Sequence, residues 1–188
     1  MAIASHMVPL GTPAPDFSLP TVDGGTVALA DLAGAPALLV AFLCEHCPYV
    51  RHVESTLGPL LAKLAAEGLA TVGICSNDTD QYPADGPDGL RVQALRAGFT
   101  FPYLIDTTQD VAKAYRAACT PDFFLYDADR RLAWRGQFDD SRPSTGGPVT
   151  GETLRAAVEH VLAGQAVPEP HQPGMGCGIK WKPGNEPS

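Results

Sequence analysis

The sequence predicts an α/β protein with a central mixed sheet flanked by helices, an N-terminal β-hairpin and an irregular C-terminal tail. Two observations support this prediction. Apolar runs of strand length alternate with segments in which apolar residues recur every three or four positions, which is the spacing of one helix face. The first two long runs, residues 37–43 and 69–75, enclose one such helical segment, and strands joined through a helix pair in parallel.

The first half of the chain contains five of the expected elements. Residues 14–20 and 26–29 flank a glycine-rich turn and are typical of a hairpin. Residues 37–43 are apolar throughout, as in a central strand that is covered on both faces. Residues 46–67 carry an apolar helix face, and residues 69–75 form a second buried strand.

The second half begins with a long polar loop at residues 76–89, which we expect to be solvated and close to the functional site. The remaining patterns predict short helices and strands that complete the sheet. The helices fall at residues 90–97, 109–118 and 151–162, and the strands at residues 101–105, 122–126 and 132–138.

The length of 188 residues and the hydrophobic content of 45% fit one domain, which we place at residues 8–165. Residues 1–7 are expected to be a flexible start outside the fold, since residues 5–7 resemble a cloning scar. The tail at residues 166–188 is rich in proline, and we expect it to dock on the domain in an extended or irregular form.

The charge balance restricts the choice of partners and compartment. With 21 acidic and 13 basic side chains the formal net charge is −8, and no long basic run could follow a phosphate backbone. Nucleic acid is therefore not an expected partner. No apolar stretch reaches membrane-spanning length and no secretion signal is visible, so we expect a cytoplasmic protein that does not bind a membrane.

The main chemical signal is the C-x-x-C motif formed by Cys44 and Cys47, where a buried strand gives way to a helix. A sulfur at the start of a helix lies beside unpaired amides, which favours a thiolate. We therefore predict that Cys44 attacks a disulfide and that Cys47, one helical turn further on, resolves the mixed disulfide. His46 would add positive charge near Cys44, and Glu45 would act in the opposite direction.

Two other interpretations of the C-x-x-C motif were weighed. The two cysteines could be half of a zinc site, but a closed structural site needs two more ligands, and neither a second C-x-x-C nor a paired histidine motif exists. They could also be inert core residues, although the charged Glu45 and His46 and the following Pro48 favour an exposed helix start. We predict no metal and no cofactor.

Three motifs together resemble a known family. They are FLCEHCPYV at residues 42–50, CTPDFF at residues 119–124 and GCGIKWKPGN at residues 176–185. In this order they resemble a peroxiredoxin-like, AhpC/TSA-type subgroup of the thioredoxin superfamily, over about residues 8–187. The resemblance implies a thioredoxin-like fold in which a cis peptide bond between Thr120 and Pro121 faces the active cysteine pair.

The resemblance also allows a peroxidase function to be weighed. In peroxiredoxins the peroxide-reducing cysteine ends a P-x-x-x-[T/S]-x-x-C motif. If Cys47 takes that position, Cys44 stands where Thr or Ser is expected and Val40 stands where proline is expected. Arg135 and Arg142 are both candidates for the arginine of such a site. We therefore rank disulfide exchange above peroxide reduction by Cys47.

The other three cysteines have open or minor roles at this stage. Cys75 ends an apolar run and is predicted to be a small buried hydrophobe. Cys119 precedes the expected proline loop, so it has either a redox role or a packing role. Cys177 is either a resolving thiol that reaches the active pair or part of a tail that docks through neighbouring apolar residues.

Three functions follow from these patterns. The first is a thiol-disulfide oxidoreductase that uses Cys44 and Cys47, with a disulfide-containing protein or small molecule as substrate and an electron donor that the sequence does not identify. The second is a thiol peroxidase with Cys47 as the reactive group. The third is a metal-binding or scaffold module.

Overall fold

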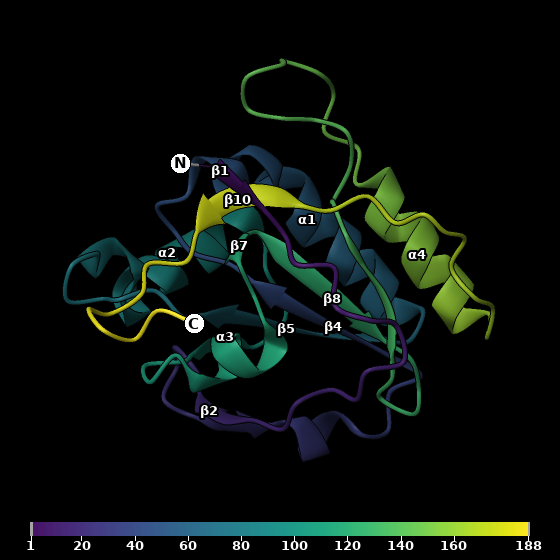
Figure 1. The fold of residues 1–188 in the computed structure, drawn as a ribbon, viewed down its shortest axis with the longest axis horizontal. Helices are drawn as coiled ribbons and strands as arrows, with labels where there is room; N and C mark the ends of the chain where they lie inside the picture. Colours follow the sequence, from purple (N-terminus) through teal and green to yellow (C-terminus); the bar gives the residue numbers. More distant parts are fainter. Residues whose placement is uncertain (1, 188) are drawn as a thin grey trace.

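A computed structural model describes residues 2–187 of the chain. Its centre is a mixed five-stranded sheet with the strand order β6-β5-β4-β8-β9 (Figure 1). Strands β4, β5 and β6 are parallel to one another, whereas β8 runs antiparallel to both β4 and β9. The five strands are β4 (Ala37–Phe42), β5 (Leu69–Cys75), β6 (Tyr103–Ile105), β8 (Asp122–Tyr126) and β9 (Leu132–Gly136). The structure thus confirms the predicted mixed α/β fold.

The sheet has a hydrophobic core on each face, because side chains alternate between the two faces along each strand. In β4, Leu39 and Ala41 face one core, and Leu38, Val40 and Phe42 face the other. All six residues of β4 are buried, which explains why its sequence is apolar throughout.

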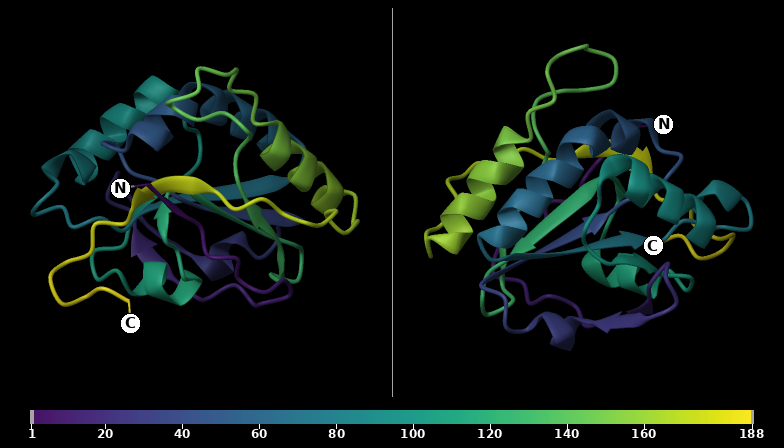
Figure 2. Two further views of the ribbon diagram at one scale, coloured as in Figure 1. Left: turned by 45° about the horizontal axis from the view of Figure 1, so that its top comes forward. Right: turned by 180° about the vertical axis from the view of Figure 1, so that it is seen from behind.

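Helices cover both faces of the sheet (Figure 2). On one face lie α1 (Pro48–Ala66), α2 (Pro87–Ala97) and α4 (Glu152–Leu162), and on the other lie α3 (Asp110–Tyr115) and the N-terminal hairpin. The hairpin consists of β2 (Ser18–Pro20) and β3 (Thr26–Ala28), which pair antiparallel as predicted. Two short 3-10 helices, η1 (Leu29–Leu32) and η2 (Pro83–Asp85), complete the connections.

The two ends of the chain meet in a second, three-stranded sheet with the order β1-β10-β7. It consists of β1 (Ala2–Ala4), β10 (Met175–Gly178) and β7 (Cys119–Thr120). In Figure 1, the purple β1 lies beside the yellow β10. The C-terminal tail is irregular on both sides of β10, as predicted.

This small sheet corrects the prediction that residues 1–7 are a flexible start outside the fold. Ala2–Ala4 pair with β10, the main-chain N–H of Ser5 donates to the Gly174 carbonyl at 2.9 Å, and the Ser5 side chain is buried. The reason is tertiary: β10 offers a strand edge, and three residues of the N-terminus satisfy its main-chain groups. Met1 lies outside the described residues.

Among residues 2–187, no helix combines the length and the apolar character needed to cross a bilayer.

The first residue of β8, Asp122, is a fully buried carboxyl group next to the loop that connects β7 to β8. One of its oxygens accepts a hydrogen bond from the N–H of Ala118 at 3.0 Å, and the other has no hydrogen-bond partner among residues 2–187. Burial raises the pKa of Asp122 from 3.8 to about 6. The folded chain therefore binds this proton more tightly than the unfolded chain does, and this contribution to stability is lost as the pH rises through about 6.

We expect the stability of Asp122→Asn relative to the parent to be higher at neutral pH than at acidic pH. At neutral pH the parent has to bury a charged carboxylate, whereas the amide of the variant is uncharged at both pH values. A difference of about two pKa units corresponds to about 3 kcal/mol, which is the upper limit of the change in relative stability. Urea unfolding of both proteins at about pH 4 and about pH 7 measures this difference. Asp129→Asn, in an exposed turn, is the control. If the difference in the free energy of unfolding between variant and parent is the same at both pH values, burial does not raise the pKa of Asp122.

Candidate active site

The C-x-x-C motif lies between the end of β4 and the start of α1. Cys47 is the N-cap residue of α1, and Pro48 occupies the first helical position. The Thr120–Pro121 peptide bond is cis, as the sequence analysis predicts. The hydroxyl of Thr120 lies 3.3 Å from the Cys44 sulfur, and Cys47 as a thiol donates to the Thr120 carbonyl at 3.1 Å. Thr120 therefore contacts both sulfurs, and neither cysteine is exposed to solvent (0% each).

The hydrogen bonds and charges around the two cysteines shift their pKa values in opposite directions. The pKa of Cys47 is lowered, first because the Cys44 thiol donates a hydrogen bond to it, and then because Thr120 and the Val50 main chain also hydrogen-bond it. The pKa of Cys44 is raised by the same hydrogen bond, by burial and by the nearby charge of Asp85. The negative charge is therefore favoured on Cys47. The physical reason is that α1 begins after Cys47, so its unpaired amides are close to the second sulfur.

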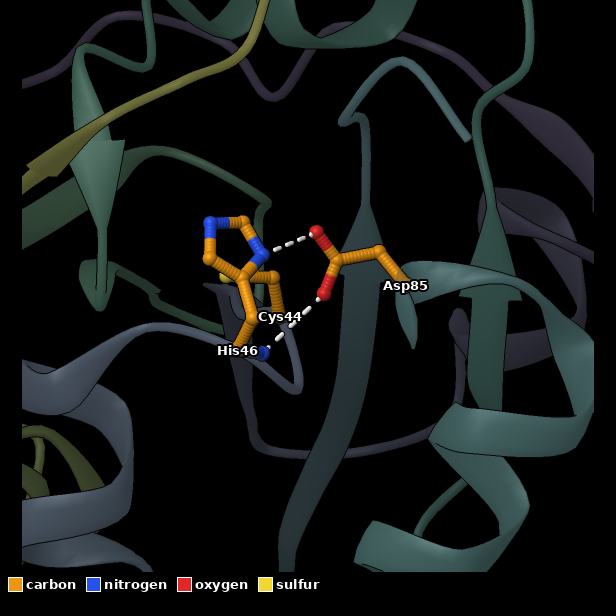
Figure 3. Close-up of side chains that lie close together, drawn as sticks. All are labelled: Cys44, His46 and Asp85. Atoms are coloured by element: carbon orange, nitrogen blue, oxygen red, sulfur yellow. Dashed lines mark hydrogen bonds and ion pairs between the residues drawn. The ribbon is translucent and has the colours of Figure 1, made fainter. Parts of the chain in front are cut away.

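Asp85 holds the C-x-x-C turn in place (Figure 3). It is fully buried at the end of η2, and one of its oxygens accepts the main-chain N–H groups of Glu45 at 2.8 Å and His46 at 3.2 Å. The other oxygen pairs with Nδ1 of His46 at 2.6 Å and accepts a hydrogen bond from Nδ2 of Asn77 at 2.8 Å. The His46 ring also stacks on Tyr82, with the ring centres 5.0 Å apart.

Sequence reasoning missed Asp85, because it treated residues 76–89 as one solvated polar loop. The loop is close to the cysteine pair, as expected, but Asn77, Asp78 and Asp85 are buried within it. The only sequence signal was the position of an acidic, polar segment directly after a buried strand. Nothing in the spacing separates Asp85 from the exposed Asp88 three residues later.

Glu45 is largely buried, and two arginines compensate its charge. Arg51 contacts its carboxylate at 2.6 Å and Arg96 at 3.4 Å, and Arg96 also pairs with Glu54 at 2.7 Å. From the same helix as Arg96, Gln93 donates to the Cys44 carbonyl at 3.0 Å. Helix α2 thus supports the motif through two side chains that the sequence analysis did not single out.

The remaining cysteines have different surroundings. Cys119 is buried beside Ser5, and burial raises its pKa. Burial also raises the pKa of Cys75, which packs in the core. Cys177 in β10 is the register partner of Thr120 and packs against the hydrophobic cluster that contains Cys44 and Cys47. Of the five cysteines, Cys177 alone is partly exposed.

The two candidate arginines lie at different places. Arg135 in β9 is buried against His171, with 2.7 Å between Nη1 of the arginine and Nδ1 of the histidine. Arg142 lines a pocket together with Pro121, Tyr49 and Met175. Of the two arginines, Arg142 therefore shares a pocket with the proline loop.

The residues that could hold a metal ion are Cys44, His46 and Asp85, whose sulfur, ring nitrogen and carboxylate oxygen lie within 4.8 Å of one another. Structural zinc sites have four ligands, so this set is one short. Asp85 also already accepts four hydrogen bonds. The arrangement fits a hydrogen-bonded support for the cysteine pair better than it fits a closed metal site.

The mixed sheet, the cis-proline loop and the C-x-x-C pair define a thioredoxin-superfamily protein of the thiol-disulfide oxidoreductase and peroxiredoxin-like class. Residues 10–135 match the AhpC/TSA family over about two thirds of the sequence, and the chain belongs to this family.

Two curated relatives share part of the sequence. The thiol-disulfide oxidoreductase ResA of Geobacillus thermodenitrificans is 29% identical over 128 residues, which is 66% of this chain and 67% of ResA. A Mycobacterium tuberculosis protein with a provisional peroxiredoxin name is 30% identical over 107 residues, or 57% of this chain. That match spans 63% of the mycobacterial protein, which is less than two thirds of its length.

Solved structures match this chain over 81% to 97% of its length. An uncharacterized conserved protein from Geobacillus kaustophilus is 49% identical with a TM-score of 0.94, and the match covers 97% of both chains. A hypothetical protein from Sinorhizobium meliloti is 48% identical with the same TM-score, over 96% of this chain and 99% of that one. A thioredoxin-family thiol:disulfide interchange protein from Chlorobium tepidum, 24% identical with a TM-score of 0.62, shares the fold over 81% of this chain and 97% of its own.

Proposed function

We propose that this protein is a thiol-disulfide oxidoreductase in which Cys44 and Cys47 alternate between a dithiol and a disulfide. The observation that supports this most directly is that Thr120 contacts both sulfurs at the start of α1, with its hydroxyl 3.3 Å from the Cys44 sulfur and its carbonyl oxygen 3.1 Å from the Cys47 sulfur. Two sulfurs three residues apart and held against one residue can form a disulfide with little movement of the chain. The substrate is a disulfide-containing protein or small molecule, and an external dithiol restores the reduced pair.

Cys47 is the attacking group in this proposal, because it holds the negative charge. Its thiolate attacks one sulfur of the substrate disulfide, which breaks as the Cys47–substrate bond forms, and the leaving thiolate takes a proton. Cys44 then gives up its proton and attacks the Cys47 sulfur, which releases the second substrate thiol. The His46–Asp85 pair is within 4.8 Å of Cys44 and can take that proton. The substrate gains two electrons from the cysteine pair and two protons, one of which replaces the proton lost by Cys44 while the other comes from solvent.

Reduction of insulin disulfides in the presence of dithiothreitol tests this proposal. We expect Cys47→Ser to reduce the rate to the background level, since no thiolate remains to start the reaction. The double variant Cys44→Ser/Cys177→Ser, which lacks both other thiols beside Cys47, should also be inactive but should accumulate a mixed disulfide on Cys47, which mass spectrometry detects. Cys75→Ser is the matched control, because Cys75 lies in the core and takes no part. Full activity in both Cys44→Ser and Cys47→Ser would refute the proposal, and a mixed disulfide trapped on Cys44 would reverse the two roles.

A thiol peroxidase with Cys47 as the reactive group is the second candidate. The low pKa of Cys47 and the membership in the AhpC/TSA family favour it. Val40 and Cys44 at the proline and threonine positions of the peroxidase motif weigh against it. Stopped-flow oxidation by hydrogen peroxide decides the question: a rate well above that of a free thiol that disappears in Cys47→Ser supports peroxidase activity, and a rate no faster than a free thiol excludes it.

A further inference from the structure

The C-terminal strand β10 lies directly against the candidate active site. It pairs antiparallel with β7, and the register places Cys177 opposite Thr120. Thr120 is the residue that contacts both Cys44 and Cys47. Cys177 also packs against the hydrophobic cluster that contains these two cysteines. The tail thus brings a third cysteine, from more than a hundred residues away in sequence, to the cluster that contains the buried pair. Figure 1 shows β10 beside β7.

Gly176 allows this close approach. A Cβ atom at this position would lie 2.1 Å from the Thr120 carbonyl oxygen and 2.6 Å from its carbonyl carbon, so only a glycine fits against the loop without movement of the main chain. The tail therefore packs at main-chain contact distance on Thr120, the residue that contacts both cysteines. Cys44 and Cys47 are sealed from solvent, whereas Cys177 on the covering strand is partly exposed.

We propose that Cys177 is a third redox cysteine, which forms a disulfide with Cys47 and carries the oxidation state of the buried pair to the protein surface. This inference rests on the proposed function, because it starts from the Cys44–Cys47 disulfide that the oxidoreductase reaction produces. A protein partner can reach Cys44 and Cys47, which have no exposed surface, only when β10 moves away. It can reach the partly exposed Cys177 with β10 in place, and the Cys47–Cys177 bond makes that sulfur the point of entry for a protein-sized reductant.

The exchange is balanced without any further reagent. The Cys177 thiolate attacks the Cys47 sulfur, the Cys47–Cys177 bond forms and the Cys44–Cys47 bond breaks, and Cys44 leaves as a thiolate that takes the proton lost by Cys177. No electrons enter or leave in this step. An external dithiol then attacks the Cys177 sulfur, is itself oxidised to a disulfide, and returns Cys47 and Cys177 to the reduced state.

The charges around Cys177 suit this order of events. Burial and the neighbouring Cys47 thiolate raise the pKa of Cys177 to about 11, so it stays protonated while the pair is reduced. Once Cys47 is in a disulfide its negative charge is gone, and Lys180 then favours the Cys177 thiolate. In the final reduction Cys47 is the leaving group, and a sulfur with a lowered pKa leaves more readily.

Disulfide mapping provides the first test. In Cys44→Ser, mild oxidation with diamide should give an intramolecular Cys47–Cys177 disulfide, identified by mass spectrometry of non-reduced peptides. The double variant Cys44→Ser/Cys177→Ser should lack it, and Cys44→Ser/Cys75→Ser should keep it. A Cys44→Ser protein in which Cys177 stays free while Cys47 is oxidised would overturn the relay.

Kinetics provide the second test. Reduced thioredoxin, a protein dithiol, should reduce the oxidised Cys177→Ser protein at least about tenfold more slowly than the oxidised parent, because the sulfur it must reach is then buried. Cys75→Ser should match the parent. If thioredoxin reduces Cys177→Ser and the parent at equal rates while the parent still reduces insulin through Cys44 and Cys47, the relay through Cys177 is wrong and the proposed function stands. A parent that never forms the Cys44–Cys47 disulfide would overturn the proposed function, and the relay with it.

Discussion

Replacing Asp85 by alanine is expected to lower the free energy of unfolding by about 3 kcal/mol, because three buried or partly buried donors lose their acceptor at once. These donors are the main-chain N–H groups of Glu45 and His46 and the side-chain amide of Asn77. The His46 ring loses its partner as well. For a chain of this size, that loss corresponds to a fall in the melting temperature of roughly 6–12 °C.

Asp88→Ala is the matched control for this prediction. Asp88 lies in the same segment of the chain, but its side chain is 98% exposed and pairs only with Arg91 on the protein surface. Exposed ion pairs contribute little, so we expect a change within about 0.5 kcal/mol. Thermal and urea unfolding of the parent and both variants measure the two effects. Equal stability of Asp85→Ala and Asp88→Ala would mean that the C-x-x-C turn does not depend on the buried carboxylate.

The elements that sequence reasoning located well are those whose burial leaves a local pattern. Residues 37–43 and 69–75 are apolar because β4 and β5 are covered on both faces. A strand that is buried on both faces needs apolar side chains on both. The last helix, α4, shows its apolar face at helical spacing for the same reason. Together with the other apolar runs, these patterns predict a central mixed sheet flanked by helices.

The second sheet could not be predicted in this way. The sequence of β10 is Met-Gly-Cys-Gly, and glycine is not typical of strands. Its two partners, β1 and β7, are three and two residues long, too short for a period of two to be visible. This sheet forms because three segments that are distant in sequence pair through their main-chain N–H and C=O groups. A single sequence does not show which main-chain groups are left to pair.

The site was predictable in its location but not in its charge distribution. The spacing of Cys44 and Cys47 after an apolar run is a local signal, and it led directly to the motif. The position of the thiolate depends on where α1 begins and on the charge of Asp85, about forty residues away along the chain. Neither is encoded near the motif, so the sequence alone does not show which member of the pair holds the thiolate.

Gly176→Ala should open the candidate site, because the new methyl group would collide with main-chain atoms that cannot rotate away. The atoms in its path are the carbonyl oxygen and carbon of Thr120. Strand β10 must therefore move away from β7, and we expect a loss of about 1–3 kcal/mol of stability, as for other overpacked positions. Because β10 covers the pair, Cys47 should also react at least about tenfold faster with iodoacetamide.

Gly178→Ala isolates the geometric cause, since it adds the same methyl group to the same strand two residues later. There the nearest atom is Cδ1 of Ile3, at 3.3 Å, which is the flexible end of a side chain and can give way. We expect the alkylation rate of Cys47 and the melting temperature of Gly178→Ala to stay close to those of the parent. If both variants left Cys47 equally protected, the tail would not control access to the pair, and the sealed state of Cys44 and Cys47 would have to come from the cis-proline loop and α1 alone.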